Sequence, residues 1–381
     1  MMFSIQSQCG KARRGELTTP HGAVQTPAFM PVGTAGTVKG ITPDQLAAAG
    51  AEMILANTYH LLLRPGPETI AKLGGLHAVM GWPGPILTDS GGYQVFSLSH
   101  RRKIDDNAVV FQSHIDGSKV ELTPASAVET QQLLGADIIM QLDECPPIPA
   151  EKSHVAEAVV RSAVWAARCR DAWLSPTDRM RALRPDATPQ ALFGIQQGGL
   201  HLDLRQQSAA ALVALDLPGY AVGGLSVGEG HDAMVSVLTH IDTMLPHAKP
   251  RYLMGVGEPR DILAAVANGI DMFDCVMPTR NGRNAQAFTW QGRVRLRNAV
   301  HAADRAPLED GCACYTCQHF SRGTLRHLFM AKEMLGPTLV TIHNLHFFAT
   351  FMRAIRQAIE DGDLPVRTAA WLTRMYPQRD E

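Results

Sequence analysis

The sequence has no long uninterrupted apolar run, so we expect no membrane-spanning helix. No stretch approaches the roughly 18 consecutive apolar residues that such a helix requires. The first residues, Met1–Gly10, also lack the basic segment and apolar core that are typical of a secretory signal. Both absences predict a cytoplasmic protein with no membrane partner.

An excess of either charge is also missing. The chain has 35 Lys and Arg against 36 Asp and Glu, a net charge of −1. This balance argues against a protein that coats nucleic acid non-specifically, although it allows a local basic patch. Hydrophobic residues make up 45% and charged residues 19%, which predicts a folded globular chain rather than a disordered one.

Cysteine is scarce and unevenly distributed. There are seven cysteines, an odd number, and three of them form the motif Cys312-x-Cys314-x-x-Cys317. Such clustering indicates a metal site rather than a disulfide framework. Zinc binds soft thiolates tetrahedrally, and we predict His343 as the fourth ligand, with His319 and His327 as alternatives.

Three cysteines and one histidine would fill all four positions of a zinc ion. No position would remain for activating a water molecule, so the zinc is predicted to be structural. We expect it to attach the segment Pro307–Gly336 to the body of the protein.

Short apolar runs alternate with helical patterns through most of the chain. The runs that end in polar or glycine-rich clusters are Pro27–Gly33, Met53–Thr58, Ile86–Gly91, Asp137–Asp143, Leu192–Gly198, Tyr220–Gly224, Arg251–Gly255 and Met272–Met277. About eight β/α units without a linker predict an eight-stranded parallel β/α barrel of the TIM type. The competing fold is a doubly wound open sheet, for which the sequence has only a faint phosphate-loop signal at 33–36.

We expect one domain over residues 1–381. Within it we predict an N-terminal antiparallel hairpin lid at 1–25, a barrel body at 26–300, a zinc-binding insertion at 301–345 and a closing barrel helix at 343–362. The hairpin consists of two strands between Phe3 and Thr19. Alternating patterns predict two further hairpins, at Val109–Leu122 and Ala285–Arg297.

The expected carboxyl ends of the strands carry most of the residues suited to chemistry. The active site of such a barrel lies at this end. Buried carboxylates there could act as nucleophile and as general acid or base, while amides and backbone groups could bind a planar heterocycle. Chemistry alone indicates a carboxylate enzyme, either a glycosyl transferase or a hydrolase. The residues that suggest it are Asn57, Asp89, Tyr93, Asp143, Cys145, Gln197, Gly224, Leu225, Met254 and Asp274.

In these stretches the chain resembles the bacterial-type tRNA-guanine transglycosylases, from about Phe3 to about Asp363. The cysteine spacing matches as well. The matching motifs are Pro31–Thr34, Asn57–Leu61, Leu87–Gln94, Phe193–Gly198, Gly223–Leu225, Gly228–Glu229, Phe273–Val276 and Pro278–Arg280.

The resemblance implies base exchange in tRNA. The family replaces the wobble guanine of tRNAs with GUN anticodons, in bacteria by 7-aminomethyl-7-deazaguanine, a precursor of queuosine. By analogy, Asp274 attacks the ribose and forms a covalent intermediate, and Asp89, held by Asn57, transfers protons. The resemblance implies that the base is bound by Asp143, Gln197, Gly224, Leu225, Tyr93 and Met254.

The resemblance also implies how the RNA and the incoming base are selected. Contacts with the anticodon loop are expected from Thr279, Arg280 and Arg283, with Arg101, Arg102 and Lys103 as further candidates. Val227 and Cys145 match the bacterial pattern, and no RNA-binding domain follows the last expected helix, so we expect the bacterial substrate. The family generally forms homodimers, with Phe320–His327 as a candidate contact.

Three positions depart from the family pattern: Ala56, Ser226 and Glu258. Glu258 places a carboxylate where a phosphate contact is common. Two other functions are alternatives to base exchange. A non-catalytic RNA-binding relative would lack the nucleophile, and a sugar hydrolase would need neither a guanine-shaped pocket nor a structural zinc.

Overall fold

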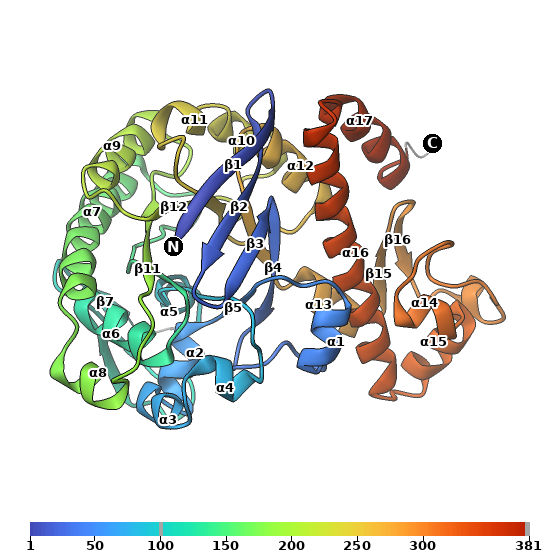
Figure 1. The fold of residues 1–381 in the computed structure, drawn as a ribbon, viewed down its shortest axis with the longest axis horizontal. Helices are drawn as coiled ribbons and strands as arrows, with labels where there is room; N and C mark the ends of the chain where they lie inside the picture. Colours follow the sequence, from blue (N-terminus) through green and yellow to red (C-terminus); the bar gives the residue numbers. More distant parts are fainter. Residues whose placement is uncertain (99–101, 378–381) are drawn as a thin grey trace.

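The computed structural model describes residues 1–98 and 102–377, and its centre is a closed barrel of eight parallel strands (Figure 1). The last strand pairs with the first, which confirms the predicted barrel and shows that the open-sheet alternative is wrong. In chain order the strands are β4 (Ala28–Gly33), β5 (Ile54–Ala56), β6 (Ile86–Thr88), β10 (Ile138–Met140), β11 (Ala191–Gln196), β12 (Gly219–Val222), β13 (Arg251–Leu253) and β14 (Met272–Cys275).

Side chains along each strand alternate between the inside and the outside of the barrel. Ala28, Met30 and Val32 of β4 belong to the interior cluster, whereas Phe29 packs in the outer layer against Phe348 of the helix α16 (Leu335–Glu360). This is the two-residue period of a strand that is buried on both faces. The two layers explain why the strand sequences are continuously apolar.

Helices cover the outside of the barrel (Figure 1). The longest are α7 (Lys152–Leu174) and α16. The others are α1 (Pro43–Ala48), α2 (Thr58–Leu63), α3 (Pro67–Lys72), α4 (Leu76–Met80), α5 (Gly92–Leu98), α6 (Pro124–Leu134), α8 (Asp178–Leu183), α9 (Leu202–Val213), α10 (His231–Leu238), α11 (Ile241–Met244), α12 (Pro259–Ala267), α13 (Met277–Arg283), α14 (Tyr315–His319), α15 (Arg322–Met330) and α17 (Leu364–Met375). The described helices include none that is long and apolar enough to cross a membrane.

A smaller lobe lies beyond α16, on the side of that helix away from the barrel (Figure 1). It contains the hairpin β15 (Gln286–Thr289) and β16 (Gly292–Arg295), a short 3-10 helix (Ala299–His301), and helices α14 and α15. The lobe has a separate apolar core, in which Leu308, Leu325 and Phe329 pack against Leu339 and Val340 of α16. The helix α16 therefore joins the two parts of the molecule.

Helix α16 corrects one expectation about the metal-binding region. We predicted a helix that starts at His343, but α16 starts at Leu335 and continues to Glu360. Pro337 lies in the first turn of α16, where proline is tolerated because its missing N–H has no partner to lose. His343 is consequently an interior residue of the helix. The last helix, α17, was not predicted.

The N-terminal segment forms a sheet of three strands, one more than predicted: β1 (Met2–Cys9), β2 (Ala12–Thr19) and β3 (Gly22–Thr26). Leu17 and Val24 are fully buried and belong to the interior cluster of the barrel. The sheet thus covers the amino-terminal end of the barrel. A second small sheet, with β7 (Arg102–Ile104), β8 (Val109–Gln112) and β9 (Lys119–Leu122), contains the second predicted hairpin.

A buried ion pair fastens the N-terminal sheet to the barrel. Arg13 of β2 pairs with Asp271, the residue before β14, and both side chains are almost completely buried. The Arg13 guanidinium also donates to the carbonyl of His247 at 2.6 Å, and Asp271 accepts from the backbone N–H of Arg251 at 2.7 Å. Both members of the ion pair therefore have further hydrogen-bond partners within the protein.

We expect Arg13→Met to lower the free energy of unfolding by about 3–5 kcal/mol, because it leaves the buried Asp271 carboxylate without its counter-charge. Arg14→Met is the matched control. The neighbouring Arg14 pairs at the surface with Glu360, which is 40% exposed, and its loss should cost less than about 1 kcal/mol. Urea unfolding at pH 7 measures both changes. Similar losses for the two variants would contradict the anchoring role of Arg13.

Candidate active site

The barrel interior continues past the carboxyl ends of the strands as a set of polar side chains. Inward-facing residues recur every second position, so the residue two places after the last interior apolar side chain also points into the barrel mouth. The pairs that follow this rule are Leu55 and Asn57, Leu87 and Asp89, Ile195 and Gln197, Tyr252 and Met254, and Met272 and Asp274.

These side chains surround a cavity of about 520 Å³ at the barrel mouth. Twelve of the predicted site residues line it, whereas Thr279 and Arg283 do not. The twelve are Asn57, Asp89, Tyr93, Asp143, Cys145, Gln197, Gly224, Leu225, Val227, Met254, Asp274 and Arg280. The structure therefore brings together residues from seven of the eight strand ends and from the loops that follow them.

Asp274 is held by two hydrogen bonds to one of its oxygens. Its Oδ1 accepts from the hydroxyl of Tyr252 at 2.5 Å and from the backbone N–H of Gly255 at 2.7 Å. Burial raises the pKa of Asp274, and these two hydrogen bonds oppose the rise. Both bonds orient the carboxylate through Oδ1, and among the described residues no hydrogen bond engages Oδ2.

The Asp89 carboxylate accepts hydrogen bonds from more groups than the Asp274 carboxylate does. It accepts from the Asn57 amide at 2.5 Å, the Thr58 backbone N–H at 2.7 Å and the Gln94 amide at 2.9 Å. Burial raises the pKa of Asp89 to about 6; the hydrogen bonds lower it, and the nearby Asp274 raises it further. A carboxyl group with this pKa can both donate and accept a proton near neutral pH.

Asp143 lies on another side of the cavity and is joined to Gln197. The Gln197 amide donates to its Oδ2 at 2.6 Å, and the Ser90 hydroxyl donates to its Oδ1 at 3.3 Å. Burial raises the pKa of Asp143 to about 6. Within the described residues, Oε1 of Gln197 is buried without a hydrogen-bond partner. A buried polar atom of this kind is a position that a ligand can satisfy.

Two glycines allow the loop after β12 to approach Gln197. A Cβ at Gly223 would lie 2.7 Å from Gln197 Nε2, and a Cβ at Gly224 would lie 2.5 Å from Oε1. Gly224 also has a φ of +63°, which favours glycine. A side chain at either position would displace the amide of Gln197. Because both residues are glycines, no side chain covers the backbone beside the cavity.

The next residues of the same loop are fixed by a carboxylate. Glu229 accepts hydrogen bonds from the backbone N–H groups of Ser226 and Val227, the second at 2.9 Å. Ser226 has a φ of 61°, an uncommon conformation for a residue with a side chain. In a planar trans peptide the carbonyl points opposite to the N–H, so the Leu225 carbonyl is directed away from Glu229.

Several residues of the site were missed in the sequence. Tyr252, Thr58, Gln94 and Ser90 bind the three carboxylates, yet the sequence analysis assigned them no role. Tyr252 had a readable signal, because it precedes Met254 by two positions and must share its face of the strand. Of the others, Thr58 and Gln94 lie in the first turns of α2 and α5 and Ser90 lies in the loop after β6, and the sequence has no comparable period that links them to the carboxylates.

The residues expected to contact RNA are placed unequally. Arg280 is exposed at the rim of the cavity, and Arg283 is half-buried. Thr279 is buried and donates to the Val276 carbonyl at 3.2 Å, so the RNA contact expected of it is not available in this conformation. Arg102 and Lys103 are exposed on β7, and Arg101 lies outside the described residues.

The structure shows what surrounds the three residues that depart from the family pattern. Ala56 is buried in β5, and Ser226 is in the Glu229-bound loop. Glu258, at the start of α12, pairs with Arg293 and accepts from the Tyr376 hydroxyl. Because Arg293 offsets its charge, Glu258 repels a phosphate less than an unpaired carboxylate would.

A separate cluster in the small lobe could hold a metal ion. The sulfurs of Cys312, Cys314 and Cys317 lie 3.7, 3.5 and 3.3 Å from Nδ1 of His343. Tetrahedral zinc bound to sulfur and nitrogen separates such atoms by about 3.6 Å, so the four predicted residues fit this ion. His343 Nε2 contacts the Phe288 carbonyl at 2.8 Å, which orients the ring.

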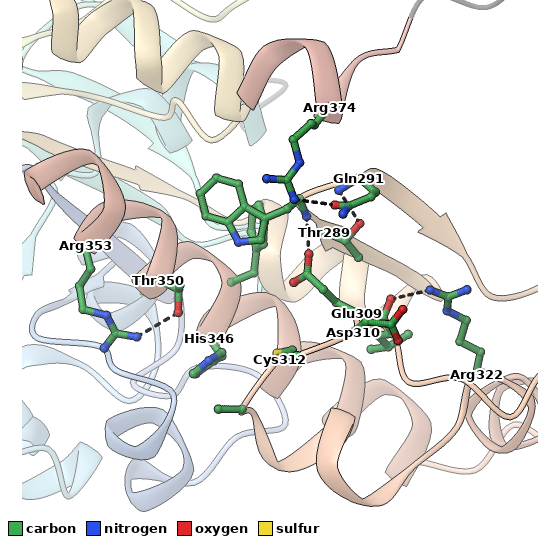
Figure 2. Close-up of a pocket in the computed structure, with 15 residues that line it drawn as sticks. Thr289, Gln291, Glu309, Asp310, Cys312, Arg322, His346, Thr350, Arg353 and Arg374 are labelled. Carbon is green, nitrogen blue, oxygen red and sulfur yellow. Dashed lines mark hydrogen bonds between the residues drawn. The ribbon is translucent and has the colours of Figure 1, made fainter. Parts of the chain in front are cut away.

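The alternatives His319 and His327 are not part of this cluster. A cavity of about 420 Å³ adjoins it, and Figure 2 shows Cys312 in the cavity wall near Glu309 and His346. The cluster lies between the loop at 308–314 and the interior of α16. A metal here would therefore join the small lobe to α16.

Known proteins resemble the chain over nearly its whole length. A family model described as queuine tRNA-ribosyltransferase matches residues 8–377. The queuine tRNA-ribosyltransferase of Zymomonas mobilis is 54% identical over 360 residues, which is 94% of this chain and 92% of the relative. Those of Thermus thermophilus and Granulibacter bethesdensis are each 52% identical; the matches cover 94% and 97% of this chain and 90% and 96% of the relatives.

We expect Cys317→Ala to lose the metal bound by the cysteine cluster, from one ion per chain to none. Three ligands hold the ion poorly, and structural metal sites contribute several kcal/mol to folding, so the melting temperature should fall as well. Elemental analysis and thermal unfolding measure the two effects. Cys9→Ala, at the end of β1, is the control. Metal retained at full stoichiometry in Cys317→Ala would disprove the four-ligand site.

Proposed function

The chain belongs to the queuine tRNA-ribosyltransferase family and is a pentosyltransferase that modifies tRNA, and we propose that it replaces the wobble guanine of GUN-anticodon tRNAs by 7-aminomethyl-7-deazaguanine. The observation that carries this proposal is one cavity in which the buried Asp89 and the half-buried Asp274 lie together with a hydrogen-bonding edge formed by Asp143 and Gln197. This combination suits the exchange of one purine-like base for another on a ribose.

In the first step, Oδ2 of Asp274 attacks the anomeric carbon of the ribose. The bond between this carbon and guanine breaks, and a covalent ribosyl ester of Asp274 forms. Tyr252 and Gly255 support this role because their hydrogen bonds to Oδ1 fix the orientation of the carboxylate. In the second step the incoming base attacks the same carbon and displaces Asp274, which yields net retention at the sugar.

Asp89 transfers the protons. It protonates the departing guanine and then removes a proton from the incoming base. Its raised pKa of about 6 supports this role, because both protonation states are accessible close to neutral pH. Asn57, Thr58 and Gln94 hold the carboxylate in one position throughout the exchange.

The remaining lining residues would recognise the base. The Asp143 carboxylate suits the two adjacent N–H donors on the edge of guanine, and the Gln197 amide, with the backbone at Gly224, suits its oxygen. Tyr93 and Met254 would stack on the two faces of the ring. Because the cavity is enclosed by the strand ends, the target nucleotide must leave its loop to enter.

The loop after β12 supports a substrate with an aminomethyl group. Glu229 binds the N–H groups of Ser226 and Val227, so the carbonyl of Leu225, a residue that lines the cavity, is directed away from Glu229, and we infer that it faces the bound base. A carbonyl in this place can accept a hydrogen bond from an ammonium group. Val227 and Cys145 line the same cavity. Their side chains would limit the room for a substituent larger than the aminomethyl group.

The same proposal includes the parts of the molecule outside the cavity. Arg280 at the rim would bind a phosphate next to the target nucleotide, with Arg283 behind it. The ion held by Cys312, Cys314, Cys317 and His343 would be a structural zinc. We further propose a cytoplasmic homodimer in which the segment Phe320–His327 contributes to the contact.

The two other functions are less well supported. A non-catalytic RNA-binding relative would need neither the Tyr252 and Gly255 hydrogen bonds on Asp274 nor the amide clamp on Asp89. A sugar hydrolase would have no use for the edge formed by Asp143 and Gln197.

We expect Asp274→Asn to reduce the exchange of labelled guanine into tRNA by at least about three orders of magnitude, because an amide cannot form the ribosyl ester. The covalent tRNA adduct seen on a denaturing gel should disappear as well. Asp178→Asn, at a fully exposed position on α8, is the matched control. Exchange near the wild-type rate in Asp274→Asn would show that another group is the nucleophile.

We also expect the enzyme to insert guanine and 7-aminomethyl-7-deazaguanine into a GUN-anticodon tRNA, but not queuine. The reason is the limited space beside Val227 and Cys145, because overpacking a fixed wall is unfavourable. Side-by-side incorporation assays with the three bases measure this preference. Efficient incorporation of queuine would overturn the proposed substrate while leaving the transglycosylase chemistry intact.

A further inference from the structure

A second cluster of metal-binding side chains lies at the opposite end of the barrel from the catalytic cavity. His21 is in the turn between β2 and β3, His77 is in α4, and Asp137 directly precedes β10. Their ligand atoms all lie within 4.8 Å of one another. We propose that these three residues form a second metal site, which binds a divalent transition-metal ion and fastens the N-terminal sheet to the barrel.

The barrel holds the Asp137 carboxylate rigidly. The backbone N–H of Asp137 donates to Ile86 and its carbonyl accepts from Ala191, so the residue is built into the ladder of β6, β10 and β11. Its side chain is completely buried, and Oδ2 accepts from the Ile86 N–H at 2.9 Å. The carboxylate is thus a ligand that the barrel holds in one orientation.

The two histidines approach this carboxylate from separate elements. Nδ1 of His21 lies 2.7 Å from Oδ1 of Asp137, and Nε2 of His77 lies 3.2 Å from Oδ2. The rings are stacked with centroids 3.5 Å apart and planes 16° from parallel. Both ring nitrogens lie beside the same carboxylate, an arrangement in which a metal ion can take a lone pair from each ring.

The site requires a small movement to close on an ion. Ligands at about 2.1 Å from a metal are separated from each other by roughly 3–4 Å, and the lone pairs of parallel rings do not converge. One ring must therefore turn. His21 can do so, because its side chain is 29% exposed and lies in a turn, while His77 is 15% exposed on the helix. Water can reach the site and supply the remaining ligands.

Asp271, a second carboxylate at the same end of the barrel, shows that the N-terminal sheet can be fastened without histidines. Asp271 has the same position before β14 and accepts the backbone N–H of Arg251, as Asp137 accepts that of Ile86. Its partner from the N-terminal sheet is Arg13, which forms a permanent ion pair and cannot bind a metal. At Asp137 two imidazoles occupy the corresponding place, and these are metal ligands.

The ligand chemistry indicates the class of ion. Two imidazole nitrogens and one carboxylate oxygen, without thiolate, suit Zn²⁺, Ni²⁺, Co²⁺ or Cu²⁺ rather than Ca²⁺ or Mg²⁺. The site differs in this respect from the thiolate cluster of the small lobe. It lies away from the reacting groups, so its role is to stabilise the floor of the barrel, and the proposal does not depend on the base-exchange activity.

The test is nickel uptake by the zinc-loaded enzyme without a histidine tag. After incubation with NiCl₂ and removal of free metal, elemental analysis should find one nickel per chain in addition to one zinc. His21→Gln and His77→Gln should each lose this nickel, although glutamine can still donate a hydrogen bond to Asp137. His240→Gln, which removes an exposed histidine elsewhere, should bind nickel as the wild type does.

Thermal unfolding provides a second readout. Nickel should raise the melting temperature of the wild type by about 2–4 °C, because it binds the folded chain, and should leave both glutamine variants unchanged. The proposal is overturned if the wild type takes up no nickel, if either variant retains the full equivalent, or if nickel enters only as zinc leaves.

Discussion

Closure of the barrel is the constraint on which the rest of the molecule depends. When β14 pairs with β4, every second residue of each strand must point inward. The inward positions are apolar along the strands and become polar beyond their carboxyl ends, so Asp89, Gln197 and Asp274 meet in one cavity. Residues that are distant in the chain thereby become neighbours without any local sequence signal that links them.

Burial gives the carboxylates their chemical character and also makes them costly. Asp89 and Asp143 each have a pKa near 6 because they are removed from water, and neighbouring donors limit that rise. Each carboxylate has its own set of donors: Tyr252 for Asp274, Asn57 for Asp89 and Gln197 for Asp143. These donors keep three similar groups in distinct positions, which is what separate roles in one reaction require.

The two ends of the barrel carry different kinds of polar residues. At the carboxyl end the acidic groups face a cavity and remain accessible to a substrate. At the amino end, Asp137 and Asp271 are buried beneath the N-terminal sheet and paired with histidines or with Arg13. The carboxyl end therefore serves chemistry and the amino end serves stability, a division that is general in this architecture.

The sequence by itself was sufficient for the eight strands, the clustering of three cysteines with His343 and most of the cavity residues, because short periods and motif spacing report local geometry. It did not reveal the third strand of the N-terminal sheet, the true start of α16, or the roles of Tyr252 and Thr58. It also placed Thr279 at the RNA surface, whereas that residue is buried. Only the tertiary structure decided these points, because each depends on contacts between segments that are far apart in the chain.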